Sequence, residues 1–251
     1  MEPEPIMVSR LTLLAALATA IPAAGQSPAP APGATPHNPS LVGGFVRDFG
    51  HDQKVIWTSP FHTNKRRWLT TVLPLAAGTA ALIAVDQRGS DALPNTHDQI
   101  AWSNHIAEAG LIYALVGATA GPIVAGKFAH NPQIARTGRR GTEAVLDALV
   151  VVMALKYPLG RQRPDDPGSG GHFFHGGDSF PSAHAVTAFA GAAAIGHDRH
   201  TPRWLKITCY VAAGTASLAR ISGRRHYPAD VLVGGVFGEL IGRYVAHKPE
   251  P

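Results

Sequence analysis

The sequence predicts an all-α protein built as a six-helix transmembrane bundle. Six apolar stretches follow one another between residues 68 and 245, and each is long enough for a helix. No segment shows the alternation of apolar and polar residues, or the Asn-Gly turn, that is typical of strands. Charged residues make up 16% of the chain, against roughly 25% in an average soluble domain. This deficit favours a membrane environment.

The six stretches differ in charge. The first two are free of charged residues, whereas the later four carry charges that must lie at a helix end or face the bundle interior. The predicted helices cover Trp68 to Val85, Ala109 to Gly126, Thr142 to Leu159, Pro181 to Gly196, Trp204 to Ile221 and Ala229 to Val245.

The first 67 residues divide into three segments of different composition. Residues 1–25 resemble an export signal, with Arg10 before the apolar run Leu11 to Ile21 and small residues after it. Residues 26–40 are rich in Pro, Ala and Ser and predict a disordered linker. Residues 41–67 mix aromatic and charged residues, which indicates an interfacial amphipathic segment or an ordinary surface loop. Residues 68–246 form the remaining domain.

The basic character of the chain suits an anionic partner. The formal net charge is +5 and the isoelectric point is about 9.6, which fits phosphate or an acidic lipid. A nucleic acid is not expected as a partner, because the basic residues lie between apolar stretches and no zinc-finger spacing is present. Cys209 is the only cysteine, so the chain has neither an intramolecular disulfide nor a cysteine-based metal site.

Three cations lie where predicted helices end. Lys156 and Arg163 follow the third helix, in Lys-x6-Arg-Pro, and Arg220 ends the fifth. Because three cations at neighbouring helix ends can converge on one anion, we expect them to form a cradle of the size of a phosphate. The predicted site therefore lies at the helix ends, on one face of the membrane.

The start of the fourth helix completes the cradle. Pro181 suits a first helical turn, so the backbone N–H groups near Ser182, Ala183 and His184 should point at the anion with the positive end of the helix dipole. With the charge neutralised in this way, neither a metal nor any other cofactor is expected.

Two histidines are the candidate reactive groups. His226 precedes Asp230 by four residues, and Pro228 suits the first turn of the last helix, so the carboxylate can hold one imidazole nitrogen. The other nitrogen then presents a lone pair to phosphorus, as a nucleophile requires. His184 can protonate the leaving oxygen and later activate water. This arrangement predicts catalysis by a phosphohistidine intermediate.

In these motifs the sequence resembles the type 2 phosphatidic acid phosphatase and vanadium haloperoxidase superfamily. The resemblance covers about Thr142 to Val245. It implies phosphate binding by the cradle residues, acid/base catalysis by His184, nucleophilic attack by His226 and orientation by Asp230. Two positions depart from the family pattern, since Ala183 replaces a glycine and Ala219 replaces the serine before Arg220. The cradle residues are Lys156, Arg163, Ser182, Ala183 and Arg220.

Other polar residues receive structural interpretations. His172 and His175 lie in a Gly-rich loop and are interpreted as loop histidines. Glu143 and Asp147 are expected to make polar contacts inside the bundle. Solvated surface positions are expected for the arginines that lie next to the motifs, with contact to a diphosphate or lipid headgroup as the alternative. These arginines are Arg161, Arg224 and Arg225.

The resemblance implies a phosphatase that hydrolyses a phosphomonoester or a diphosphate. Two charge-free stretches ahead of the motifs favour a membrane enzyme acting on a phosphorylated lipid, such as a phosphatidate-like lipid or an isoprenoid diphosphate. The alternatives are a soluble periplasmic acid phosphatase of the same superfamily, supported by the export signal and a mean hydropathy of +0.02, and a non-catalytic membrane bundle for lipid binding or transport. A haloperoxidase is less favoured, because the superfamily members with that activity are much longer chains than this one.

The expected location is a bacterial-type inner membrane, with several passes. Lys and Arg crowd residues 47–67, 127–140 and 199–206, which six spans place opposite the motifs. The positive-inside rule puts those regions in the cytoplasm and the active site on the outside. A cleaved export signal would imply the reverse, but it depends on one short segment. We therefore favour a site that faces the periplasm.

Overall fold

The computed structural model describes residues 41–62 and 64–248, and this part of the chain is helical without any strand. The signal-like segment 1–25 and the linker 26–40 lie outside the described residues. The helices, in chain order, are α2 (Leu41–Thr58), η1 (Ser59–His62), α3 (Lys65–Arg67), η2 (Trp68–Val72), α4 (Leu73–Asp91), α5 (His97–Leu115), η3 (Val116–Ala120), α6 (Gly121–Phe128), α7 (Pro132–Leu159), α8 (Ala183–Gly196), α9 (Arg203–Ser222) and α10 (Pro228–His247). The prediction of an all-α protein is confirmed for the described residues.

Each predicted apolar stretch lies in a helical region, but several of the bounds were wrong. The second region begins at His97, twelve residues before its predicted start, and runs through α5, η3 and α6. The first helical region continues past Val85 to Asp91, so it contains a buried carboxylate at Asp86. The third helix begins at Pro132, ten residues before its predicted start, because Asn131 caps it by accepting the N–H groups of Gln133 and Ile134. An apolar search misses these first turns because they carry basic residues.

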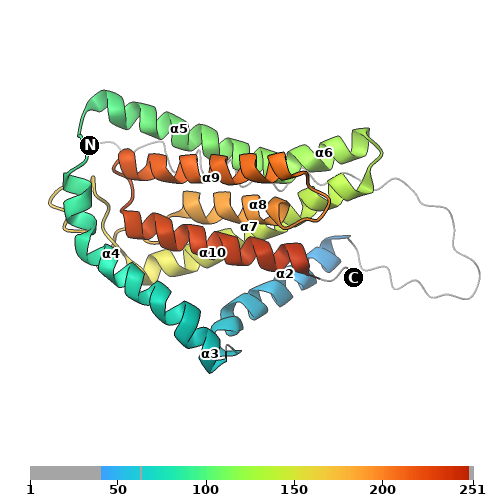
Figure 1. The fold of residues 1–251 in the computed structure, drawn as a ribbon, viewed down its shortest axis with the longest axis horizontal. Helices are drawn as coiled ribbons and strands as arrows, with labels where there is room; N and C mark the ends of the chain where they lie inside the picture. The colour runs from blue at the N-terminus through green and yellow to red at the C-terminus, as the bar shows by residue number, and fades with distance from the viewer. Residues whose placement is uncertain (1–40, 63, 249–251) are drawn as a thin grey trace, which may run out of the picture. The chain divides into compact units, whose positions relative to one another are not determined.

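Helix α8 lies in the middle of the bundle, in contact with α7, α9 and α10 (Figure 1). The main core consists of small and β-branched side chains from α7, α8 and α10, among them Ala148, Val152, Val186 and Val245. The α8–α10 contact is the most extensive one. A Cβ atom added to Gly238 would lie 2.3 Å from the carbonyl oxygen of Val186, so this position has no room for a side chain.

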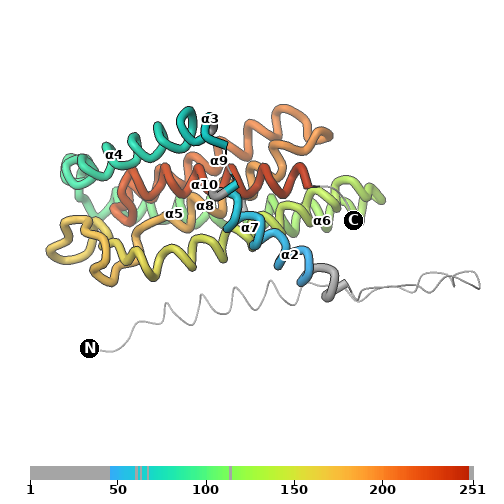
Figure 2. Tube along the Cα trace, turned by 90° about the horizontal axis from the view of Figure 1, so that it is seen from below, coloured from blue at the N-terminus to red at the C-terminus, as the bar shows by residue number. Residues whose placement is uncertain are grey.

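The segment 41–67 is helical over α2, which lies against α7 and α10 (Figure 2). Asp52 is fully buried and accepts hydrogen bonds from Tyr244 (2.9 Å) and Lys248 (2.7 Å) of the chain's last turns. Gln53 donates to Asp147 of α7 at 2.8 Å. The expectation that Asp147 makes a polar contact inside the bundle is therefore confirmed, whereas the interfacial position of this segment stays a prediction.

Two helical regions of the described chain are long and apolar enough to cross a membrane. They are Trp68–Asp91, with a mean hydropathy of 1.8, and His97–Phe128, with a mean hydropathy of 1.6. The other predicted spans carry more charge or, in the case of α8, are shorter. The count of six spans therefore remains a prediction.

Candidate anion-binding active site

Four helix ends and one loop meet at the candidate site. Helices α7, α8, α9 and α10 run alternately up and down, so the end of α7 and the start of α8 lie beside the end of α9 and the start of α10 (Figure 1). Helix α7 stops at Leu159 because Gly160 adopts a left-handed conformation, with φ of 46°. The chain then forms the loop 160–182 over the site.

The three predicted cations are placed around this end of the bundle. Lys156 is buried in the last turn of α7 and donates to the backbone oxygen of Asp178. Arg163 forms a two-pronged ion pair with the Asp178 carboxylate, at 2.6 and 2.8 Å. Arg220, at the end of α9, is 7% exposed, and its Nε atom has no hydrogen-bond partner among the described residues. A buried donor without a partner is costly, so this atom is available to an anion.

Asp178 was missed by the sequence analysis. Burial alone would lower the pKa of Arg163 and raise that of Asp178, but their ion pair overrides burial in both cases. The pKa of Arg163 is raised and that of Asp178 is lowered. The Asp178 carboxylate thus binds the guanidinium group that the sequence analysis assigned to phosphate. The only sequence signal for Asp178 is its position shortly before Pro-Ser-Ala-His.

The start of α8 differs in register from the prediction. Pro181 precedes the helix instead of lying in its first turn, and Ser182 is the N-cap, accepting the N–H of Ala185 at 3.5 Å. The backbone N–H of Ser182 donates to the Asp230 carbonyl oxygen. Ala183 and the half-buried His184 therefore form the first turn, where N–H groups lack partners inside the helix. This part of the cradle lies one residue later than predicted.

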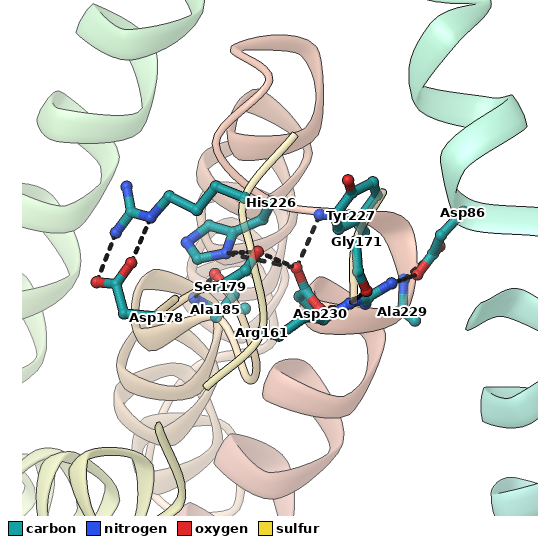
Figure 3. A network of polar contacts seen from close by, with 12 residues as sticks. Asp86, Arg161, Gly171, Asp178, Ser179, Ala185, His226, Tyr227, Ala229 and Asp230 are labelled. Atoms are coloured by element: carbon teal, nitrogen blue, oxygen red, sulfur yellow. Dashed lines mark hydrogen bonds and ion pairs between the residues drawn. The ribbon is translucent and has the colours of Figure 1, made fainter. Parts of the chain in front are cut away.

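His226 is buried next to Asp230, but the contact is not the simple helical pair that the spacing predicted. His226 lies before α10, and its Nδ1 is 3.7 Å from Asp230 Oδ2. The Ser179 hydroxyl donates to the same carboxylate oxygen at 2.5 Å and lies 3.5 Å from Nδ1 (Figure 3). Since the Ser179 proton is used on Asp230, its oxygen can accept Nδ1–H. This leaves the Nε2 lone pair of His226 free to react.

Electrostatics keep His226 neutral. Burial lowers the pKa of His226 to about 4, although the nearby Asp230 carboxylate acts in the opposite direction. The positive charges of Lys156 and Arg220 lower the pKa further. A neutral imidazole close to these cations can act as a nucleophile toward a bound anion at pH 7.

The surface interpretation of Arg161 was wrong. Its side chain is 2% exposed and lies between the rings of Phe173 and Tyr227, 4.8 and 4.3 Å from their centres. It donates to Asp230 at 2.6 Å and to Asp86 of α4 at 2.9 Å (Figure 3). Arg161 therefore holds the carboxylate side of the site and is turned away from solvent.

The other residues near the motifs lie at the edge of the site. His172 and His175 are exposed in the loop 160–182, as expected for loop histidines. Arg225 pairs with Asp165 at 2.7 Å, and Arg224 donates to the Ser90 carbonyl oxygen at 2.8 Å. These two arginines thus have protein partners in addition to solvent.

Comparisons with known proteins place the site in a family. The sequence profile of the PAP2 superfamily matches residues 142–250. The Lipid A 1-phosphatase of Porphyromonas gingivalis is 36% identical over 94 residues, which are 37% of this chain and 19% of that protein. The chain thus spans about a fifth of the length of this curated relative. Residues 142–250 thus resemble the PAP2 superfamily over the region that carries the motifs. The resemblance inferred from the motifs is confirmed.

Two solved structures share similarity with the chain at 20% sequence identity and a TM-score of 0.48. LpxE of Aquifex aeolicus covers 64% of this chain and 92% of its own. The first transmembrane PAP2-type phosphatidylglycerolphosphate phosphatase from Bacillus subtilis covers 80% of this chain and 92% of its own.

Within this PAP2 region lie all the sequence-predicted site residues together with Arg161, Asp178 and Ser179. Asp86 lies outside the matched range. The sequence signal that could have revealed it is a carboxylate directly after a charge-free apolar stretch.

Proposed function

We propose that the protein is a phosphatase that hydrolyses a phosphomonoester or diphosphate of a lipid through a phosphohistidine intermediate. The observation that carries the proposal is the buried, neutral His226, held by Ser179 and Asp230 within the electrostatic reach of Lys156 and Arg220. A nucleophile and an anion cradle at one place are the two components that phosphoryl transfer needs. The match to the PAP2 superfamily supports the same reaction.

In the first step, the substrate phosphate binds in the cradle. There it takes the place of the Asp178 carboxylate as the partner of Arg163. The Nε2 lone pair of His226 forms a bond to phosphorus while the bond from phosphorus to the leaving oxygen breaks. His184 donates a proton to that oxygen, so the product leaves as an alcohol or, from a diphosphate, as a phosphate. His226 keeps its Nδ1 proton and becomes cationic, and Asp230 stabilises this charge.

In the second step, water replaces the histidine on phosphorus. His184, now neutral, accepts a proton from the water, whose oxygen forms a bond to phosphorus as the bond to Nε2 breaks. Inorganic phosphate leaves, and His226 and His184 return to their starting protonation states. The net reaction consumes one water for each phosphate released.

The exposed apolar surface favours a membrane enzyme over the soluble alternative. In α4 the buried residues are the polar Asp86 and Ser90, whereas apolar side chains such as Leu73 and Val85 are about half exposed. A helix with polar groups inside and apolar groups outside suits lipid as its solvent. The exposed Trp102, Ile112 and similar side chains of α5 extend this surface. We therefore propose a phosphorylated lipid as the substrate and a bacterial-type inner membrane as the location.

The covalent intermediate provides the decisive test. A phosphate-labelled lipid phosphate in mixed micelles, mixed with the enzyme and quenched within milliseconds, should leave label on the protein that is stable in base and labile in acid. His226→Ala should abolish this label. Acid-stable label would indicate a serine or threonine ester, and inversion at a chiral phosphorus would indicate direct attack by water. Either result would contradict the proposal.

His184→Ala is the matched variant for the second histidine. Because this substitution removes proton donation to the leaving oxygen, an alkyl lipid phosphate should lose far more activity than an aryl phosphate, whose leaving group needs no proton. Label on His226 should then accumulate from the aryl substrate, since water attack is slowed. Equal losses on both substrates would assign His184 a different role.

A further inference from the structure

Asp86 is a buried carboxylate on a helix that otherwise exposes its apolar side chains. Its residue exposure is 1%, and α4 extends beside α10 only near its own C-terminal end (Figure 1). An ionised side chain in such a helix is expensive to bury and needs a specific partner. The partners of Asp86 all lie in the PAP2 region.

Asp86 is bound at both of its oxygen atoms. Oδ2 accepts from Arg161 at 2.9 Å, and Oδ1 accepts the backbone N–H of Ala229 at 3.1 Å (Figure 3). Ala229 lies in the first turn of α10, next to Asp230 in the chain. Arg161 uses its other terminal nitrogen to bind Asp230 at 2.6 Å. Asp86 thus reaches Asp230 both through a guanidinium and through the backbone.

The charges of this group must be considered together. One guanidinium lies between two carboxylates, and all three side chains are at most 2% exposed. Without Asp86, the positive charge of Arg161 would cancel the negative charge of Asp230. With Asp86 present, the trio of Asp86, Arg161 and Asp230 keeps one net negative charge beside His226. A buried site that must stabilise a cationic phosphohistidine needs that charge.

We propose that Asp86 is a positioning residue for the active site, which acts through Arg161 to fix Asp230 and to preserve its negative charge for His226. The inference rests on the proposed function, because it needs His226 to become cationic. It also assigns α4, which lies outside the matched PAP2 region, a part in the reaction.

Docking of α4 by other contacts provides the control. Tyr227 donates through its hydroxyl to Gln87 at 2.9 Å, one residue along α4 from Asp86. Gln87→Ala removes this neutral contact between α4 and the N-cap of α10, and it leaves the charged group of Asp86, Arg161 and Asp230 intact. If α4 only needs to be docked, Gln87→Ala and Asp86→Asn should have similar effects.

The test is a charge cycle on the full chain in detergent. Asp86→Asn keeps an oxygen for the Ala229 N–H but makes the trio neutral, and Arg161→Gln leaves two carboxylates uncompensated. The double variant restores one net negative charge with neutral side chains of similar size. Activity on a lipid phosphate in mixed micelles, the rate of label transfer to His226 and thermal unfolding are measured for each variant.

We expect Asp86→Asn to lower kcat by roughly 10- to 100-fold. This is the range seen when a residue that orients a metal-binding side chain is lost. The KM should stay within about threefold, because the phosphate cradle is untouched. The double variant should be more active than Arg161→Gln, since the net charge is restored, and Gln87→Ala should stay within about twofold of the wild type. The proposal is overturned if the losses of the single variants simply multiply in the double variant, or if Gln87→Ala matches Asp86→Asn.

Inhibition by inorganic phosphate separates folding from catalysis. As the product it occupies the cradle without a bond to His226, so an inhibition constant within about threefold of the wild type should show that Asp86→Asn retains a folded site. If this variant unfolds, the comparison of Arg161→Gln with the double variant still decides, because an equal or lower activity of the double variant overturns the proposal. A wild-type enzyme that forms no labelled histidine would instead refute the proposed function.

Discussion

At the scale of single residues, the candidate site depends on a histidine kept neutral by burial and a carboxylate kept charged by its partners. The charges of Lys156 and Arg220 act on His226, and the Ser179 hydroxyl oxygen lies 3.5 Å from its Nδ1 atom. Asp230 accepts from Ser179, from Arg161 and from the backbone N–H of Tyr227, at 2.5, 2.6 and 2.8 Å. Three donors make this carboxylate a fixed negative charge, which is what orients the imidazole.

The lowered pKa of His226 predicts how stability depends on pH. Because the pKa is about 4 in the folded protein and 6.5 in a free histidine, the unfolded state binds more protons between these values. Stability from the buried neutral His226 is therefore complete above pH 6.5 and is lost as the pH falls toward 4, by on the order of 3 kcal/mol. The free energy of unfolding should show this loss in the wild type but not in His226→Gln. Parallel curves for the two proteins would contradict the burial of a neutral imidazole.

The sequence could predict which residues gather at the site, because each motif stands at the end of an apolar stretch. It could not predict the partners that come from folding the loop 160–182 back over the bundle. Ser179 and Asp178 reach His226 and Arg163 only because that loop crosses the helix ends, and Arg161 is buried only because Phe173 and Tyr227 enclose it. A serine in a loop or an arginine in Arg-x-Arg-Pro has no local pattern that distinguishes burial from exposure.

At the scale of helices, the close approach of α8 and α10 places the helix starts that carry the two histidines side by side, with the Ser182 N–H bonded to the Asp230 carbonyl oxygen. His184 lies in the first turn of α8, and His226 directly precedes α10. Their relative position is fixed by glycines on α10 that face backbone oxygens of α8, since added Cβ atoms at Gly238 and Gly242 would each lie 2.3 Å from such an oxygen. Packing between these helices therefore sets the geometry on which the proposed mechanism depends.

Gly238→Ala should separate α8 from α10. The added methyl group has no space, so we expect a loss of roughly 1 to 3 kcal/mol in the free energy of unfolding, as for other overpacked interiors, together with reduced kcat. Gly214→Ala on α9 is the matched control, because nothing lies within 4 Å of its added Cβ. That substitution should stabilise its helix by up to about 1 kcal/mol. Thermal unfolding and activity of both variants in detergent measure the difference, and equal effects would argue against close packing at Gly238.

Helix bounds illustrate what an apolar pattern can and cannot reveal. The C-terminal end of α7 was predicted correctly at Leu159, since Gly160 terminates the helix. Its start was placed too late, because the turns after Pro132 carry Arg136, Arg139 and Arg140 and derive their stability from the Asn131 cap and from packing. Similarly, α4 extends past Val85 because Asp86 is satisfied by Arg161, a partner 75 residues away. Helix propensity and hydropathy are calculated from residues that are close in the chain, so they cannot reveal a helix bound that depends on a distant partner.

At the scale of the whole molecule, the proposed function depends on where the site lies relative to the membrane. The loop 160–182 carries Arg161 and Arg163, both paired with carboxylates. The opposite ends of the helices carry a larger number of basic residues, which by the positive-inside rule favour the cytoplasm. These are Lys127, Arg136, Arg139, Arg140, Arg199, Arg203 and Lys206.

This asymmetry predicts the outcome of labelling in intact bacterial cells. Cys209 is the only cysteine, so a Cys209→Ser background allows one new thiol at a time. His175→Cys lies in the site loop and His200→Cys lies between α8 and α9, and both positions are exposed. If the site faces the periplasm as proposed, a membrane-impermeant maleimide should label His175→Cys in intact cells and should label His200→Cys only after the membrane is permeabilised.

The reverse labelling pattern would place the site in the cytoplasm, as a cleaved export signal ahead of six spans implies. Labelling of both thiols in intact cells, with the protein released by osmotic shock, would indicate a soluble periplasmic enzyme. Because both cysteines replace exposed histidines outside the catalytic group, lipid phosphatase activity of the two variants should match the Cys209→Ser parent. The activity readout thus shows that each labelled chain is folded, and the position of the reactive thiol then identifies the compartment in which the phosphate is released.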